Sequence, residues 1–420
     1  MRAFDIVLRP RDPLLVRDGR PFGRDPGARA ESLHWPLPST IAGALRTFIG
    51  PSAMPPFKWD GDGPERALRV PVRGPLMVAT SPGGQWKVHV PRPLDTSVVC
   101  EPDDRVVFKG LRPAGSQPAG WSNLPASLLP MAIEDDRKQQ PGFDWWPLES
   151  LIPWMAGRAE FPPSEECHAG PAHETRVHVA VDSATLTARE SALFSTISLD
   201  FMSSTAHRAA RASRYGNPGK GPRQGGRTAV DLRRDGRDRP QVAMLCRFLQ
   251  EEGAGSPETG NYLPLGGERR VSLVEDPVLL GVEWPRFPSA IGEACRNSAR
   301  LRLQLVTPAL FSGGWRPGWL DGNLEGSPPG AEGLRVKLVS AVIGRRVPIS
   351  GWDMRKGKGP KAARYAVPAG SVYYFESIDA AGSDGSRLWL ESLCDELQDR
   401  HDGFGIALPG TWSYADRGEA

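Results

Sequence analysis

Apolar residues along the chain follow first a strand pattern and then a helix pattern. Alternation over 4–9 predicts a first strand. After a turn-rich loop, the segment 39–49 has apolar residues at helical spacing, namely Ile41, Ala44, Leu45, Phe48 and Ile49. Ser39 or Thr40 can cap this helix at its start, and Gly50 can close its end.

Later patterns extend this order. The segments 176–181 and 191–201 predict a hairpin with a long loop, and 242–249 predicts a helix. The segments 262–265 and 270–274 then supply a final strand. Strand, helix, strand, strand, helix, strand is the ferredoxin-like (RRM-like) order.

The same order recurs in the second half. Strands are predicted at 300–306, 334–342, 371–376 and 404–408. A poorly defined segment near 319–324 takes the place of the first helix, and the second helix is marked by Leu390, Leu393, Cys394 and Leu397. We therefore predict an α+β protein of two tandem ferredoxin-like βαββαβ domains.

The predicted domains span 1–285 and 286–420, with 285–298 as a connector. Proline, glycine and tryptophan are frequent from about 51 to 170, which suggests a large insertion in the first domain with short strands at 67–72, 86–90 and 105–108. Within it, the tryptophans of 121–155 form either a satellite core or a docking surface for a protein partner.

Charge is unevenly distributed along the 420 residues. The net charge is only +3, but the stretch 207–240 holds ten Lys or Arg residues against three Asp, so we predict a basic loop at about 205–240. A second basic run occupies 355–364. Two basic, glycine-rich loops favour a polyanionic partner.

Cysteine usage and hydropathy indicate the compartment. The five cysteines form no Cys-x-x-Cys pair, which is typical of a reducing cytosol. We find no signal sequence and no apolar run long enough to span a membrane. The expectation is a cytoplasmic protein without a membrane partner.

A candidate anion site lies on the helix of 39–49. Gly43 and Arg46 fall on the side opposite the apolar residues, so the missing side chain of Gly43 leaves room beside the Arg46 guanidinium. Near a helix N-terminus, with Ser39 and Thr40 in the first turn, this combination suits a phosphate. The alternative is a helix that covers a sheet and carries a solvated arginine.

Glycine-rich passages lie at equivalent places in both halves. Gly266 and Gly267, followed by Arg269 and Arg270, belong to the first half. The second half has Gly403 and Gly405. Because successive glycine amides can form an anion nest, we expect RNA backbone contacts here, although a glycine pair by itself indicates only a turn.

Aromatic residues beside glycine are candidates for base stacking. Trp315 follows Gly313 and Gly314, and Trp352 follows Gly351. Most aromatics of the second half are expected in the core, because strand aromatics usually are.

Catalytic and metal sites are not expected. His207, Tyr215 and Lys220 resemble a set for metal-free RNA cleavage, but a flexible loop cannot hold a base in position. Cys167, His168, His173 and His178 have no zinc-finger spacing, and no Ser-His-Asp pattern is recognisable. We predict no catalytic residue, no metal and no cofactor.

Seven ordered motifs span almost the whole chain. They are Leu14–Phe22, Pro38–Arg46, Asn261–Arg270, Leu303–Trp315, Ile349–Asp353, Val367–Phe375 and Gly403–Trp412. In this order they resemble the family of third RAMP subunits of the Cmr complex, the type III-B CRISPR RNA-guided interference complex. Residues 51–170 and 205–240 contribute little to the resemblance. It implies tandem ferredoxin-like domains, glycine-rich phosphate cradles and an RNA path along the helix that carries Gly43 and Arg46. Arg17 and Arg20, in the first motif, join the RNA-binding candidates.

The resemblance implies a non-catalytic RNA-binding subunit for antiviral defence. It would grip the 5′ tag of the guide (CRISPR) RNA and bridge the large polymerase-like subunit to the neighbouring backbone RAMP subunit, meeting target RNA only indirectly. Two alternatives stay open: a RAMP endoribonuclease that processes the guide, and a scaffold that makes protein contacts only.

Overall fold

A computed structural model describes residues 1–19, 29–30, 32–81, 83–103, 105–116, 125, 127–132, 137, 139–140, 142–202, 241–353, 355, 359–378 and 385–415. The predictions for Arg20, for the basic loop at 205–240 and for His207, Tyr215 and Lys220 lie outside the described residues. Within the described part, no helix is long and apolar enough to cross a membrane.

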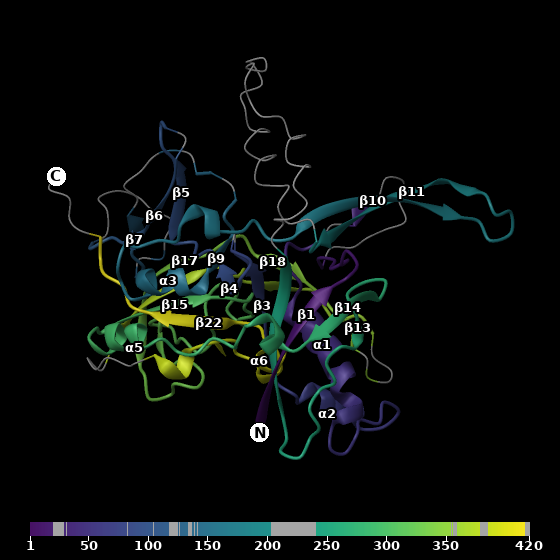
Figure 1. Ribbon diagram of the computed structural model, residues 1–420. Helices are drawn as coiled ribbons and strands as arrows, with labels where there is room; N and C mark the ends of the chain where they lie inside the picture. The colour runs from purple at the N-terminus through teal and green to yellow at the C-terminus, as the bar shows by residue number, and fades with distance from the viewer. Residues whose placement is uncertain are drawn as a thin grey trace.

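A seven-stranded antiparallel sheet forms the first half of the molecule (Figure 1). The strand order is β13-β14-β1-β12-β3-β4-β9. The strands are β1 (Arg2–Pro10), β3 (Val72–Thr80), β4 (Trp86–Pro91), β9 (Trp145–Pro147), β12 (Val242–Gln250), β13 (Tyr262–Leu265) and β14 (Arg270–Glu275). Strands β3, β4 and β9 come from the predicted insertion, so much of 51–170 belongs to this sheet.

Strand β12 corrects the predicted helix at 242–249. Its sequence is apolar almost throughout, and it is buried on both faces of the sheet. Ala243 and Leu245 face one core, whereas Met244 and Phe248 face another. A continuous apolar run of this length is consistent with either a helix or a fully buried strand. The segment forms a strand because it pairs with β1 on one side and β3 on the other.

Helix α1 (Pro38–Ile49) covers one face of this sheet, as predicted. Ile41, Leu45 and Ile49 are buried against it at helical spacing. The predicted N-cap at Ser39 or Thr40 is wrong, because Leu37 is the N-cap and has no side-chain hydrogen bond, whereas Gly50 is the C-cap as predicted. The chain also continues from Gly50 in a right-handed conformation into the short helix η1 (Gly50–Ser52).

A six-stranded sheet forms the second half. Its order is β16-β17-β20-β15-β22-β21, and all its pairs are antiparallel. The strands are β15 (Arg300–Leu305), β16 (Glu325–Gly326), β17 (Val336–Val342), β20 (Val372–Ser377), β21 (Glu391–Ser392) and β22 (Ile406–Gly410). The four strands predicted for this half correspond to β15, β17, β20 and β22.

The two halves share one four-strand order. Strands β14-β1-β12-β3 correspond to β22-β15-β20-β17, and each set has the ferredoxin-like order 4-1-3-2 when numbered along the chain. The α+β class is therefore confirmed. The helices differ from a complete βαββαβ unit: no helix lies between β12 and β14, and none lies between β15 and β17, where every residue is described.

The predicted helix around Leu390–Leu397 is mostly extended. Leu390, Leu393 and Cys394 are buried around strand β21, whereas Leu397 is exposed and begins the five-residue helix α6 (Leu397–His401). The apolar spacing therefore reflected a buried edge strand followed by a turn.

Smaller elements surround the two sheets. The helices are α2 (Gly63–Leu68), α3 (Leu148–Met155), α5 (Ser289–Arg296), η2 (Ser164–Glu166), η4 (Pro277–Leu280) and η5 (Ser386–Leu388). The paired strands are β5 (Thr96–Cys100) with β6 (Val106–Gly110), β7 (Arg112–Pro113) with β8 (Met131–Ala132), and β18 (Val347–Ile349) with β19 (Arg364–Ala366). Trp145, Trp146 and Trp154 are buried, so these tryptophans belong to the core rather than to a docking surface.

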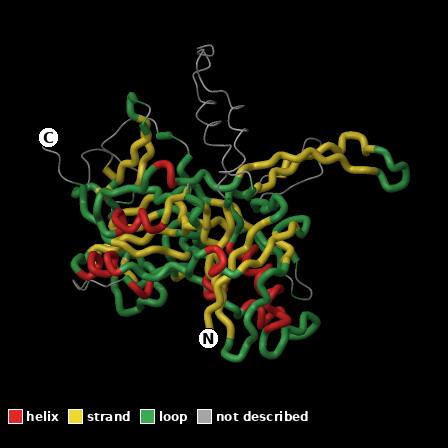
Figure 2. The backbone as a smooth tube through the Cα atoms, in the orientation of Figure 1, coloured by secondary structure: helices red, strands yellow, loops and turns green. Residues whose placement is uncertain are grey.

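A two-stranded hairpin projects from the body (Figures 1 and 2). It consists of β10 (Ala172–Val181) and β11 (Ala188–Asp200), as the alternation predicted. Short strand β2 (Arg29–Ala30) pairs with β11. Val177, Val179 and Val181 are exposed along one face of β10, and Leu193 is exposed opposite Val179.

One hydrophobic cluster spans both halves. It contains Leu76 and Trp146 of the first sheet together with Ile291 of α5 and Ile406 and Leu408 of β22. Burial of one apolar surface shared by two sheets makes their packing cooperative. The junction between the halves is therefore part of the core.

Candidate nucleic-acid interface

A short N-terminal segment, Leu14–Val16, lies between the hairpin and the first glycine-rich loop. The amides of Leu14 and Leu199 donate to each other's carbonyls at 2.8 and 2.7 Å, and the Gly267 amide donates to the Leu15 carbonyl at 2.7 Å. All three residues of the segment are buried. The segment therefore brings Arg17 and the loop 266–270 to the foot of the hairpin.

Gly266 and Gly267 are required for close backbone packing. Gly266 has φ +71°, and a Cβ atom there would lie 2.8 Å from the Leu15 carbonyl oxygen. The Gly267 amide is already used by that carbonyl. The predicted anion nest is thus not supported at Gly267, because its N–H faces the protein.

The arginines around this segment differ in availability. Arg11 and Arg269 are exposed, and their guanidinium groups form no hydrogen bond or ion pair with the described residues, although the Arg11 backbone amide donates to the Val271 carbonyl. Arg17 is also exposed, while Arg270 pairs with Glu268. We name the exposed set, Arg11, Arg17 and Arg269, the foot arginines. Arg11 was missed in the sequence, although its position in a Pro-Arg-Asp-Pro turn after the first strand indicates exposure.

Hairpin residue Arg176 also lies at this foot. Its guanidinium forms two hydrogen bonds with the Glu174 carboxylate, at 2.9 and 3.2 Å. That hydrogen-bonded carboxylate raises the pKa of Arg176, and Glu268 and Asp12 act in the same direction from nearby. Acidic side chains are therefore interspersed, and among the described residues the cations left for an outside anion are chiefly Arg11 and Arg269.

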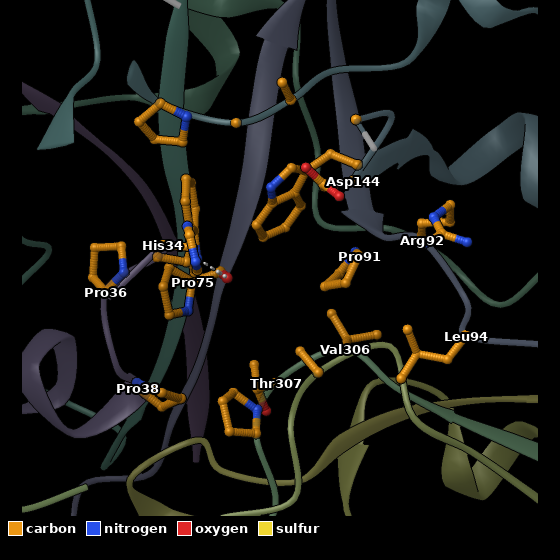
Figure 3. A pocket seen from close by; sticks show the side chains of 18 of the residues that line it. His34, Pro36, Pro38, Pro75, Pro91, Arg92, Leu94, Asp144, Val306 and Thr307 are labelled. Carbon is orange, nitrogen blue, oxygen red and sulfur yellow. Dashed lines mark hydrogen bonds between the residues drawn. The ribbon is translucent and has the colours of Figure 1, made fainter. Parts of the chain in front are cut away.

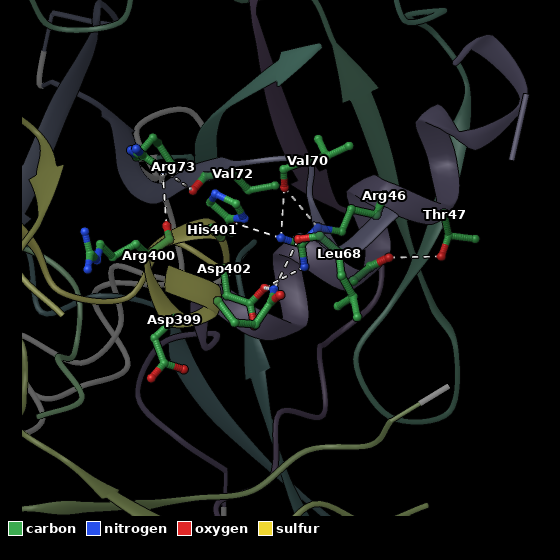
Figure 4. Close-up of polar contacts among 12 residues, drawn as sticks. Arg46, Thr47, Leu68, Val70, Val72, Arg73, Asp399, Arg400, His401 and Asp402 are labelled. Carbon is green, nitrogen blue, oxygen red and sulfur yellow. Dashed lines mark hydrogen bonds and ion pairs between the residues drawn. The ribbon is translucent and has the colours of Figure 1, made fainter. Parts of the chain in front are cut away.

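Arg46 corrects a central prediction (Figure 4). Instead of facing solvent, it is 4% exposed and pairs with Asp402 at 2.6 Å. It also donates to the carbonyls of Val70 and His401. A phosphate would have to displace Asp402 and two carbonyls, so the geometry assigns Arg46 to holding α1 against α6.

The rest of the predicted helix site is also altered. Gly43 is exposed with open space where a Cβ would lie, and its carbonyl accepts a hydrogen bond from Thr47 Oγ1 at 2.9 Å. Ser39 and Thr40 are half-buried, and the Thr40 amide already donates to the Leu37 carbonyl. Helix α1 therefore offers neither the predicted arginine nor a free Thr40 amide.

Gly403 and Gly405 are buried packing positions. A Cβ at Gly403 would lie 3.1 Å from two carbonyl oxygens of β3, and one at Gly405 would lie 2.6 Å from the Cys394 sulfur. Their amides donate to the carbonyls of Arg400 and Pro308. The predicted phosphate cradle in the second half is therefore wrong in its geometry, since both amides are used internally.

Trp315 stays available as an aromatic surface. Its side chain is 36% exposed, and its carbonyl accepts a hydrogen bond from the Tyr373 hydroxyl at 2.6 Å. Its loop is anchored by Asp395, which accepts from the amides of Ser312 and Gly318. Trp315 therefore belongs to the surface of the second half.

A cavity of about 690 Å³ lies at the junction of the two halves (Figure 3). Trp35, Trp145, Arg92 and Asp144 line it from the first half, and Thr307 lines it from the second. Sequence reasoning missed this site, because its residues are far apart in the chain and no motif links them.

Two aromatic contacts shape the cavity wall. The rings of Trp35 and Trp145 lie 4.7 Å apart, and the Trp35 indole N–H donates to the Pro75 carbonyl at 3.2 Å. The imidazoles of His34 and His173 meet edge to face at 5.2 Å. The tryptophans are thus held by each other and by the Pro75 carbonyl, all within the cavity wall.

Arg92 and Asp144 supply the charge beside the cavity. Arg92 donates to the Thr96 carbonyl at 2.5 Å, while its buried Nε has no partner among the described residues. Burial lowers the pKa of Arg92, and the nearby Asp144 carboxylate opposes this shift. The cavity edge therefore carries opposite charges rather than an excess of positive charge.

Predicted metal ligands do not form a cluster within the described part of the chain. No group of three or more His, Cys, Asp or Glu side chains there could hold a metal ion. Cys167 is buried, and His168 packs edge to face on His89 at 4.8 Å. The absence of metal and cofactor chemistry stays a prediction.

Fold and surface together define an α+β protein of two antiparallel sheets with exposed arginines at the foot of a projecting hairpin. The family model of the CRISPR-associated protein (Cas_Cmr3) matches residues 6–412. The chain belongs to this family. No curated protein matches the chain.

The solved structures that are similar to the chain include two of the Type III-B Cmr-beta. One is a cryo-EM structure of the Type III-B Cmr-beta bound to cognate target RNA and AMPPnP (state 1), at 14% identity and a TM-score of 0.45. The other is the Type III-B Cmr-beta bound to cognate target RNA, at 15% identity and a TM-score of 0.43. Each match covers 88% of this chain and 86% of the matched chain.

Proposed function

We propose that this chain is a non-catalytic, RNA-binding subunit of a type III-B Cmr complex. It grips the 5′ repeat-derived tag of the guide RNA and bridges the large polymerase-like subunit to the neighbouring RAMP backbone subunit. Family membership over 6–412 supports the assignment to a Cmr complex.

The foot arginines are the observation that carries RNA binding. Arg11, Arg17 and Arg269 come from two distant parts of the chain and are brought to one place by the Leu14–Val16 segment. Exposed guanidinium groups on a rigid backbone suit phosphates, because they donate paired hydrogen bonds without a large ordering cost. Single-stranded RNA offers both phosphates and unpaired bases to such a surface.

The hairpin supports a role in bridging subunits. Its exposed valines form an apolar strip, which water solvates poorly and which a protein partner covers favourably. The foot arginines lie where the hairpin leaves the body. A neighbouring subunit can therefore cover the apolar strip while RNA binds at the foot arginines.

Reconstitution of the complex tests the proposal. Guide RNAs with the native tag, a scrambled tag or no tag are crosslinked to complexes that contain the wild-type chain. Crosslinks from the tag to peptides around Arg11 and Arg269 are expected, with weaker retention of the tagless guide. Tag crosslinks confined to other subunits, with equal retention of all three guides, would leave only the protein-scaffold function.

An endoribonuclease is the second candidate, favoured by the contact between His34 and His173. Metal-free RNA cleavage needs one group to accept a proton and another to donate one, on opposite sides of the scissile phosphate. Rings that touch edge to face at 5.2 Å leave no space for a phosphate between them. We therefore retain the non-catalytic assignment.

Histidine variants test this second candidate. His34→Ala, His173→Ala and the double variant are assembled into the complex, with His178→Ala on the hairpin as control. Guide maturation and target cleavage are expected to be unchanged. Loss of either cleavage by about a hundredfold, the scale of one general acid or base, in an intact complex would establish the endoribonuclease.

A further inference from the structure

A small lobe lies between α1 and β3. It consists of residues 50–69, which contain η1 and α2, and we name it the side lobe; α2 lies at the margin of the molecule, beyond α1 (Figure 1). Gln398 donates to the Leu68 carbonyl at its end, which ties the side lobe to α6. Neither the foot arginines nor the hairpin belongs to it, so a role for the side lobe goes beyond the proposed function.

The side lobe holds two aromatic rings in a defined arrangement. Phe57 and Trp59 meet edge to face, with their ring centres 5.8 Å apart. The Arg66 guanidinium lies over the Phe57 ring at 5.2 Å and donates to the Pro55 carbonyl at 2.8 Å. The side chain of α2 that packs on this pair is therefore used inside the lobe.

A tight turn after Trp59 keeps the pair in position. The amides of Gly61 and Gly63 both donate to the Lys58 carbonyl, at 3.0 and 2.9 Å. A Cβ atom at Gly63 would lie 2.5 Å from that carbonyl oxygen, so the turn requires glycine there. A surface that is ordered before a partner arrives loses little conformational entropy on binding.

The outer surface of the side lobe is apolar. Trp59 is 46% exposed and Met54 is 60% exposed, and Pro55 and Pro56 between them in the chain are exposed as well. Tryptophan and methionine are enriched in protein interfaces, and a tryptophan held by its neighbours is a typical centre of binding energy. This surface therefore suits a protein partner.

Acidic residues border this apolar surface. Asp60 and Asp62 follow Trp59 and are exposed. The neighbouring segment 251–260 contains three exposed glutamates and no Lys or Arg, and its Gly255 amide donates to the Ser52 carbonyl of the side lobe at 3.2 Å. We name these five carboxylates the acidic rim: Asp60, Asp62, Glu251, Glu252 and Glu258.

The balance of charge decides the kind of partner. Residues 50–69 and 251–260 together hold six Asp or Glu and three Lys or Arg, and one of the three cations, Arg66, is used inside the lobe. RNA phosphates would be repelled by this surplus of carboxylates, whereas Arg or Lys side chains would be attracted. The open face of an indole also attracts a cation.

We infer that the side lobe binds a basic, apolar segment of another protein. Apolar side chains of that segment cover Met54 and Trp59, which removes both from water. An Arg of the segment stacks on the Trp59 indole and forms charge-assisted hydrogen bonds with the acidic rim. Recognition therefore needs both properties in one segment, and neither alone is sufficient for tight binding.

Defined peptides test this chemistry on the full chain. A short fluorescein-labelled peptide with the repeat Leu-Pro-Arg is titrated, and fluorescence anisotropy measures its affinity. Control peptides carry Glu in place of Arg or Ser in place of Leu. The Leu-Pro-Arg peptide should bind at least about tenfold more tightly than either control, the scale of one strong interface contact. Its affinity should also fall as salt is raised, because screening weakens exposed charge pairs.

Two variants locate the binding surface. Trp59→Ala should weaken the Leu-Pro-Arg peptide by about tenfold or more, whereas Trp352→Ala, which removes an exposed tryptophan of the second half, should not. Asp60→Lys leaves both rings in place and should also weaken binding, so the test does not depend on how the lobe tolerates Trp59→Ala. Glu149→Lys makes the same charge change on the exposed face of α3 and is its control.

Photocrosslinking tests the inference in the assembled complex. Met54 is replaced by p-benzoylphenylalanine, and the captured peptide is identified by mass spectrometry. A segment of another subunit that contains Arg or Lys among apolar residues is expected, and Asp60→Lys in the same chain should reduce its capture. The same photoreactive residue in place of Val278, exposed on η4, is the control and should not capture that segment.

The opposing outcomes are distinct. Equal affinity for the three peptides, or an affinity that both Trp59→Ala and Asp60→Lys leave unchanged, would overturn the inference. Crosslinks from position 54 to RNA or to a second copy of this chain would overturn it as well. Because these variants leave Arg11 and Arg269 in place, retention of tagged guide RNA in the same complexes still reports separately on the proposed function.

Discussion

Arg302 and Asp95 form an ion pair whose side chains are 1% and 0% exposed. The Arg302 Nε and Nη2 atoms lie 2.7 and 2.8 Å from the two Asp95 oxygens. The same carboxylate accepts hydrogen bonds from the Tyr374 hydroxyl at 2.6 Å and the Trp154 indole at 3.3 Å. A loop of the first half is thus fixed to the second sheet by a carboxylate whose hydrogen-bonding capacity is filled.

Removal of one partner of this pair should destabilise the protein strongly. Arg302→Met leaves the Asp95 carboxylate buried without its cation, which costs about 3–5 kcal/mol. Urea unfolding monitored by circular dichroism measures the loss. Arg300→Met, which removes an exposed partner of Glu376, is the control and should cost less than about 1 kcal/mol. Equal midpoints for the two variants would contradict the interpretation.

Arg46→Ala should likewise affect stability rather than RNA affinity. The substitution leaves the Asp402 carboxylate buried without its cation and removes the donors to the carbonyls of Val70 and His401. The free energy of unfolding is therefore expected to fall by about 3–5 kcal/mol. Thr47→Ala on the same helix should change little. Folded Arg46→Ala at low temperature should bind guide RNA like the wild type. A tenfold weaker affinity with unchanged stability would restore the phosphate site predicted from the sequence.

The foot arginines should set the salt dependence of RNA binding. Replacing Arg11 and Arg269 together by alanine removes two phosphate contacts, so the slope of log affinity against log salt should fall by about 0.7 for each contact to single-stranded RNA. Filter binding at several salt concentrations measures the slope. Arg286→Ala removes an exposed arginine near α5 and should leave it unchanged. A slope identical to the wild type would place RNA elsewhere.

Stability should decrease as the pH falls below about 6.5. Burial lowers the pKa of His89 from 6.5, and although its hydrogen bonds to the carbonyls of Lys87 and Glu166 favour the charged ring, burial outweighs them. Burial also lowers the pKa of His401, and Arg46 and Arg73 add to this effect. The unfolded chain therefore binds more protons just below pH 6.5, and the stability present above that pH is lost progressively.

Urea midpoints at about pH 7.5 and about pH 5.5 measure this dependence, which cannot exceed about 1.4 kcal/mol per histidine per pH unit. His89→Gln should reduce it, whereas His178→Gln on the hairpin should not. A midpoint that rises on acidification would show that the two histidines are charged in the folded protein.

Strand positions could be predicted where alternation was clear, as in β1 and the hairpin β10–β11. Periodicity failed for β12, because a strand buried on both faces has no polar side to reveal its period. It also failed around Leu390, where residues buried beside an edge strand happen to fall at helical spacing. In both places the neighbouring strands, which local sequence does not specify, decide the conformation.

The candidate site was predictable only in part. Four of the predicted RNA-binding candidates lie in one region of the structure, brought together by the Leu14–Val16 segment: Gly266, Gly267, Arg17 and Arg269. The exposure of Arg46 was predicted wrongly because its partner Asp402 is remote in sequence. Helical spacing identifies the polar face of a helix, but it does not reveal whether another part of the chain covers that face. The junction cavity depends on the packing of two sheets, which no local pattern encodes.

Helix α6 has a consequence for how the chain folds and for how it can be divided. Five residues are too few for a stable isolated helix. Arg364 pairs with Asp399 of α6 inside the second half, but two further ties reach back to the first half, where Arg46 contacts Asp402 and Gln398 donates to the Leu68 carbonyl. A fragment that begins near residue 286 would therefore lack part of the support for its own last helix. Expression of the halves as separate pieces should yield folded protein only when both are present together, as a complementing pair.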